Sequence, residues 1–145
     1  MTTICAFLTA DHRHAEALFA AAGQAAQSGH WTGCRKQFEA FRVALGQHIS
    51  IEEQVLFPAF EKATGIAAGP TRIMRNEHAD MLAMLETISA TIDEQDIVRC
   101  LAATRQFSSV MALHSAKEEN VLYPLCDEAL PGITGEALCG KALGS

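Results

Sequence analysis

The sequence predicts an all-α protein, an antiparallel up-down-up-down four-helix bundle built from two repeated helical hairpins. Strand patterns are nearly absent, and apolar residues recur at helical steps of three and four in four long segments. The chain also repeats itself at an offset of 66 residues, most clearly where HISIEEQVLFP at residues 48–58 becomes HSAKEENVLYP at residues 114–124. Two copies of one hairpin therefore account for most of the chain.

Each of the four segments carries one apolar seam that we expect to face the bundle interior. The first seam contains Cys5, Leu8, His12, Ala15, Phe19 and Ala22. The second contains Trp31, Cys34, Phe38, Phe41, Leu45, His48, Glu52, Val55 and Ala59. The third contains Met74, His78, Met81, Leu85 and Ile88. The fourth contains Ile97, Cys100, Thr104, Phe107, Met111, His114, Glu118, Val121 and Leu125.

Turn-forming residues separate these segments. Breaks fall at Ser28-Gly29, across residues 64–70 and across residues 90–93. Such short connections favour antiparallel neighbours. Pro58 and Pro124 lie late in the second and fourth segments, where a kink or a helix end is expected.

The length of 145 residues fits a single domain with one hydrophobic core. We expect the bundle to occupy residues 1–128. The remaining residues, 129–145, form a weakly patterned C-terminal tail to which the sequence assigns only packing.

Composition narrows the class of partner. The chain has 11 basic and 17 acidic residues and no basic cluster, which argues against nucleic acid or an anionic membrane as a partner. It shows no leader-like segment and no apolar run of membrane-spanning length. Its 5 cysteines form no CxxC pair, and an odd number favours reduced thiols. We therefore expect a cytoplasmic protein.

Six polar residues occupy seam positions where a bundle normally has Leu or Ile: His12, His48, Glu52, His78, His114 and Glu118. A buried ionised carboxylate without a partner costs several kcal/mol. Residues four apart on a helix lie one turn apart on nearly the same face, so each His-x-x-x-Glu pair can aim at one internal point. Two halves related by a pseudo-twofold axis place two metal ions side by side, with each Glu able to bridge both.

Simpler interpretations exist for either motif alone. A single His on an apolar face is usually a hydrogen-bonded core residue, and a lone His-x-x-x-Glu is a surface pair on many helices. The duplicated set, in register on the interior seams, favours a metal centre instead. Carboxylate bridges favour Fe or Mn, while spacing alone leaves Zn possible.

Neighbouring polar residues receive different interpretations. His14 points away from His12 and is expected in solvent, while His30 is expected in a turn. Glu16, four residues after His12, is a reserve ligand. Two further sets flank the predicted ligands: Asp11 and Glu77, Glu53 and Glu119. Each of these acids is either exposed or a hydrogen-bond acceptor for a ligand ring.

Cys34 and Cys100 match across the repeat. They lie two turns or more from the His-x-x-x-Glu ligands, and we expect them to be buried small apolar residues.

These motifs resemble the hemerythrin HHE cation-binding family, whose pattern is a His followed by His-x-x-x-Glu, repeated twice. The resemblance covers about residues 1–127. It implies an antiparallel four-helix bundle around a non-haem di-iron centre, with the six seam residues as metal ligands. Members of the family bind oxygen, sense oxygen, iron or redox state, or react with nitric oxide, and some are linked to repair of damaged iron centres.

The sequence departs from the oxygen-carrying hemerythrins. Those carry a second His one turn before the His of the third helix and a HxxxxD spacing on the fourth, whereas this chain has Met74 and HxxxE. The resemblance therefore implies a more symmetric four-His, two-Glu centre, nearer to the sensor-like and nitric-oxide-related members than to oxygen carriers.

The favoured function is a di-iron protein that binds or senses O₂, NO, peroxide or redox state, without a catalytic residue of its own. Met74, Met81, Phe19 and Leu85 are expected to line a dry cavity beside the metals. A redox enzyme that oxidises Fe²⁺ or repairs iron centres is the alternative, and a purely structural metal is the second alternative. The sequence names no protein partner.

Overall fold

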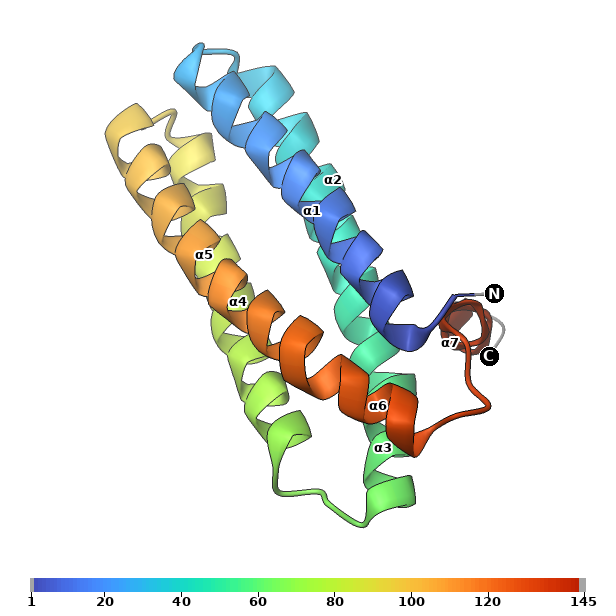
Figure 1. The fold of residues 1–145 in the computed structure, drawn as a ribbon. Helices are drawn as coiled ribbons and strands as arrows, with labels where there is room; N and C mark the ends of the chain where they lie inside the picture. The colour runs from blue at the N-terminus through green and yellow to red at the C-terminus, as the bar shows by residue number, and fades with distance from the viewer. Residues whose placement is uncertain (1, 144–145) are drawn as a thin grey trace.

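The computed structural model describes residues 2–143, and every regular element within that range is a helix (Figure 1). The prediction of an all-α fold is confirmed. The first hairpin comprises α1 (Ile4–Gln27), α2 (Trp31–Ile51), the π-helical turn η1 (Glu52–Leu56) and α3 (Phe57–Thr64). The second comprises α4 (Pro70–Asp93), α5 (Ile97–Lys117), the π-helical turn η2 (Glu118–Leu122) and α6 (Tyr123–Ala129), and α7 (Gly135–Leu143) follows.

The sequence repeat is also a repeat of structure. α4 and α5 each begin and end 66 residues after α1 and α2, and η2 follows η1 at the same offset. α1 packs against α2 and α4 against α5, and the two hairpins meet through α1 with α5 and α2 with α4. Figure 1 shows these long helices side by side, with α3 and α6 at one end of the bundle.

Two apolar clusters fill the interior. One contains Phe38, Phe41 and Phe107 from the half of the bundle nearer the α1–α2 turn. The other contains Leu8, Leu56 and residues of α3, α6 and α7 at the opposite end. Along each long helix the predicted polar residues lie between these clusters, so a narrow polar layer separates two dry regions.

The π-helical turns change the helix register immediately after the two seam glutamates. Pro58 lacks an N–H and its ring collides with the carbonyl group four residues back, so a regular α-helix cannot pass through it undisturbed. The helix instead takes one extra residue in this turn, and the Phe57 N–H donates to the Glu52 carbonyl oxygen, five residues earlier. Tyr123 N–H bonds to the Glu118 carbonyl in the same way.

This register shift corrects the predicted seams. Beyond Glu118 we expected Val121 and Leu125 to face inward, but these side chains are 55% and 40% exposed. The inward positions are taken by Leu122, Tyr123 and Cys126 in the second half and by Leu56, Phe57 and Phe60 in the first. One extra residue per turn explains the error, because it rotates every later side chain about the helix axis.

The tail beyond the bundle contains a helix that the sequence did not predict. α7 packs against α1, α2 and η1. Gly135 N–H donates to the Thr2 carbonyl oxygen at 3.0 Å, and Thr2 donates in turn to the Glu136 carboxylate. Within residues 2–143, no helix combines the length and apolar character needed to cross a membrane.

We predict that Gly135→Ala destabilises the protein. A Cβ at this position would lie 2.1 Å from the Cβ of Phe7, so α7 must shift away from α1. The expected cost is about 1–3 kcal/mol of unfolding free energy. Gly140→Ala in the same helix is the matched control, because no atom lies within 4 Å of its added Cβ. Equal midpoints of chemical denaturation for the two variants would refute the docking of α7 described above.

Candidate metal centre

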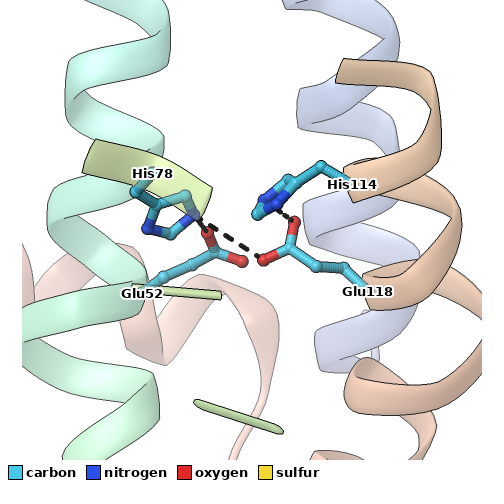
Figure 2. A group of neighbouring side chains, drawn as sticks. All are labelled: Glu52, His78, His114 and Glu118. Carbon is cyan, nitrogen blue, oxygen red and sulfur yellow. Dashed lines mark ion pairs between the residues drawn. The ribbon is translucent and has the colours of Figure 1, made fainter. Parts of the chain in front are cut away.

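The six predicted ligands lie together in the polar layer, each at most 3% exposed: His12, His48, Glu52, His78, His114 and Glu118. The four imidazoles come from α1, α2, α4 and α5, and each carboxylate opens one of the π-helical turns. Figure 2 shows Glu52, His78, His114 and Glu118 pointing at one another from facing helices. The structure thus brings all six into one place.

The donor atoms form two groups that share Glu118. In one group, Glu52, His78, His114 and Glu118 each offer an atom within 4.8 Å of the others. In the other, His12, His48 and Glu118 do the same. Glu118 Oε1 lies 3.0 Å from His12 Nε2 and 3.3 Å from His114 Nε2, so one carboxylate reaches both groups.

Glu52 spans the centre in the same manner. Its Oε1 lies 3.1 Å from His78 Nε2 and 3.4 Å from His48 Nε2. Each group therefore has two imidazoles, and both carboxylates stand between the groups. Two neighbouring ions with shared carboxylates match this arrangement chemically.

Every imidazole of the centre is held on its outer side by a carboxylate. The Nδ1–oxygen distances are 2.7 Å for His12–Glu119, 2.8 Å for His48–Asp11, 2.7 Å for His78–Glu53 and 2.8 Å for His114–Glu77. A carboxylate accepts from Nδ1–H, which leaves the lone pair of Nε2 directed inward. Of the two interpretations of these four acids, the structure supports acceptors for ligand rings.

Three inward-facing atoms in this layer are buried without a hydrogen-bond partner. They are Glu52 Oε1, His78 Nε2 and Glu118 Oε2. Glu52 Oε1 and His78 Nε2 lie 3.1 Å apart, yet neither holds a proton to share when Nδ1 carries the ring proton. Unsatisfied buried acceptors are costly, and a cation satisfies all three at once. The donor set of imidazole nitrogens and carboxylate oxygens fits iron, manganese or zinc.

Electrostatics in the metal-free protein depend on the same residues. Burial alone would raise the pKa of Glu118, but interactions with Glu52 and the surrounding imidazoles hold that pKa well below its ordinary value of 4.5. Burial alone would lower the pKa of His48, but the carboxylates of Glu52 and Asp11 raise it well above 6.5. The pKa of His114 is also raised, by Glu118 and Glu77 against the effect of burial.

Three other candidates lie outside the centre. His14 is exposed, and His30 is exposed at the turn before α2, as the sequence indicated. Glu16, the reserve ligand, pairs with Arg13 at 2.5 Å and belongs to neither donor group. Cys34 and Cys100 are buried in the apolar cluster nearer the α1–α2 turn, in agreement with the expectation of small core residues.

The predicted dry cavity takes a different form. Met74, Met81, Phe19 and Leu85 are all buried, but they are divided between the two apolar clusters. A pocket of about 190 Å³, partly open to solvent, lies between α1 and α5, and its lining contains none of the six predicted ligands: Glu16, Phe19, Ala20, Ser108, Met111 and Ala112. Of the four predicted residues, Phe19 alone lines it, because the large Met side chains are packed into the clusters rather than around a void.

Sequence reasoning missed one residue of the centre, Tyr123. Its hydroxyl lies 2.6 Å from Glu52 Oε2 and 3.0 Å from Glu118 Oε1. Burial and these two carboxylates raise the pKa of Tyr123 well above 10, so the phenol is protonated in the metal-free protein. The available signal was the pairing of Tyr123 with Phe57 across the repeat, but the seam register placed both outside the interior.

Comparisons with known proteins agree with this geometry. The family model described as "Hemerythrin HHE cation binding domain" matches residues 3–126. The "Iron-sulfur cluster repair protein YtfE" of Edwardsiella ictaluri is 29% identical over 106 residues, which cover 64% of this chain and 48% of that protein. The protein of the same name from Enterobacter sp. is 31% identical over 101 residues, covering 63% and 46%. The chain spans about half the length of these relatives, and no solved structure matches it significantly.

We predict that Asp11→Asn weakens metal binding. The variant removes the charge that holds the Nδ1–H of His48, and loss of such an outer partner typically costs about 10- to 100-fold in metal affinity. Competition of the protein with a chelator for Zn²⁺ and, without oxygen, for Fe²⁺ measures the change. Asp80→Asn, an exposed acid on α4, is the control and should bind as the unmodified chain does. An unchanged affinity in Asp11→Asn would contradict the role given to the outer carboxylates.

We predict a stability maximum in mildly acidic solution for the metal-free protein. The raised pKa values of His48 and His114 give stability that is complete below 6.5 and is lost as pH rises through their folded-state pKa values. The lowered pKa of Glu118 gives stability that is complete above 4.5 and is lost at lower pH. Thermal midpoints measured from about pH 4 to pH 8.5 should therefore peak between these two limits. A midpoint that climbs steadily toward pH 8.5 would be the opposite result.

Proposed function

This chain belongs to the hemerythrin HHE cation-binding family, and on that premise we propose that it holds two iron ions and binds or senses a small ligand such as O₂, NO or peroxide. The observation that carries the proposal is the set of buried, unpartnered atoms of Glu52, His78 and Glu118 between four oriented imidazoles. When bound, iron supplies reversible redox chemistry and coordination positions for an external ligand.

The ligand set supports iron over a closed structural zinc site. Each donor group contains two imidazoles, and the carboxylates are shared between the groups. Closed structural zinc sites use four protein ligands for one ion, commonly with Cys among them. The described cysteines lie outside both donor groups, which favours a centre with room for exchangeable ligands.

The protein's own residues provide orientation and exclude water. Four carboxylates fix the ring tautomers, so the imidazoles need no rearrangement when a metal enters. Apolar clusters on both sides of the layer keep bulk water out.

We also propose that the four long helices follow the up-down-up-down order of the family, with the bundle as one domain over residues 1–128. Short connections join helices that pack along their lengths, which supports antiparallel neighbours. All five cysteines are free thiols, which is consistent with a cytoplasmic location.

Participation in the repair of iron–sulfur clusters is the second candidate. It is favoured by similarity to relatives named "Iron-sulfur cluster repair protein", at 29% and 31% identity. The whole donor set lies within residues 3–126, which match the hemerythrin HHE family model. Such a role would add transfer of iron or NO to the binding function proposed above.

We predict that the reduced, iron-loaded protein changes its optical spectrum rapidly on mixing with O₂ or NO, once per centre. Stopped-flow absorption measures the change. His12→Ala should abolish it because one ion loses half of its imidazoles, whereas His14→Ala, two residues away and exposed, should not. Repeated turnover of added Fe²⁺ would identify an enzyme instead. An iron-loaded protein with no response to either gas would contradict the proposal.

A further inference from the structure

The two halves of the centre differ in the aromatic residue that follows each π-helical turn. Phe57 and Tyr123 follow the two π-helical turns at equivalent places in the repeat, and both are fully buried. Phe57 stacks on the ring of His78, with 6.0 Å between centroids and 7° between planes. Tyr123 lies beside His12, with 5.6 Å between centroids and 27° between planes. The first half therefore carries a phenyl ring at this position, and the second half carries a phenol.

The phenol oxygen of Tyr123 stands among donor atoms of the centre. It lies 3.2 Å from both His12 Nε2 and His48 Nε2. It also lies 2.6 Å from Glu52 Oε2 and 3.0 Å from Glu118 Oε1. Four donors from four elements therefore surround one oxygen, on the side of the layer where His12 and His48 lie.

Hydrogen bonding leaves part of this arrangement unexplained when the imidazoles are neutral, which is the form that binds a metal. The Nδ1–H groups of neutral His12 and His48 donate outward to Glu119 and Asp11, so both Nε2 atoms present lone pairs to the phenol. The hydroxyl has one proton, and Glu52 at 2.6 Å receives it. His12 Nε2, His48 Nε2 and Glu118 Oε1 then face a lone pair of the phenol oxygen, and no proton lies between them. A cation beside the phenol oxygen converts all of these contacts into favourable ones.

We propose that Tyr123 is a further ligand, bound only to the metal held by His12 and His48, so that the metal held by His78 and His114 takes the external ligand. This inference rests on the proposed metal-binding function. As the metal–oxygen bond forms, the phenol O–H bond breaks and its proton leaves to solvent, with no change in oxidation state.

The asymmetry assigns the two halves different tasks. A phenolate adds negative charge and fills a coordination position on one ion. The equivalent position near the other ion is taken by Phe57, which has no donor atom. That ion keeps a free position against an apolar ring, which suits a small uncharged ligand.

The test uses the fact that the chain contains a single tyrosine. Any tyrosinate signal therefore comes from Tyr123. The iron-loaded, oxidised protein should show a visible phenolate-to-iron charge-transfer band and tyrosinate ring vibrations in resonance Raman spectra excited within it. Loading with Zn²⁺ should produce the ultraviolet difference spectrum of a tyrosinate, which tests the bond without iron chemistry.

Tyr123→Phe is the matched variant, because it makes this position identical to Phe57 and preserves apolar volume. It should retain the metal content of the unmodified chain and lose all three signals. An unmodified chain that holds metal but shows no tyrosinate signal would overturn the ligand role while leaving the proposed function intact. A chain that binds no metal would overturn both, and elemental analysis of the same samples separates these outcomes. If the variant fails to fold, the spectra of the unmodified chain decide alone.

Discussion

The structure depends on two carboxylates, Glu52 and Glu118, that face each other in the interior of a small helical protein, both fully buried. Two unpaired buried charges of one sign would cost several kcal/mol each, more than a single domain of this size readily tolerates. Four imidazoles surround them, and a further carboxylate orients each imidazole from outside. Cations between the carboxylates would offset the cost of burying these charges. Metal binding would therefore stabilise the fold, and the fold in turn holds the donor atoms together.

The backbone at the centre follows from the same requirement. Each π-helical turn begins at a ligand glutamate and is followed by a proline, Pro58 or Pro124. The added residue rotates the next aromatic side chain toward the candidate metal centre, with Phe57 against His78 and Tyr123 against Glu52. A local distortion that would weaken an ordinary helix therefore completes the wall of the centre. The backbone of the centre is duplicated, and the two aromatic residues that follow the π-helical turns differ by the hydroxyl of Tyr123.

Periodicity was sufficient to predict the helices and the six inward polar residues, because His12 or Glu118 on an apolar seam is conspicuous at helical spacing. The second interpretation of Asp11 and Glu77, as acceptors for ligand rings, also followed from their position beside the histidines. Tyr123 could not be predicted, since the seam was extended at constant register and a π-helical turn adds one residue. α7 escaped prediction because it is short and depends on contacts distant in sequence: Leu138 packs into the apolar cluster that contains Leu8 and Leu56, and Gly135 bonds to Thr2. The expectation of a dry cavity lined by Met74 and Met81 was wrong because these flexible side chains fill the apolar clusters.

The most direct test of the account is the number of metal ions that the chain holds. The metal-free protein would be loaded with Fe²⁺ without oxygen, freed of excess iron by gel filtration, and analysed for iron and protein in the same fractions. The account predicts about two irons per chain, because two donor groups share Glu52 and Glu118. A chain that retains one iron or none under these conditions would contradict it.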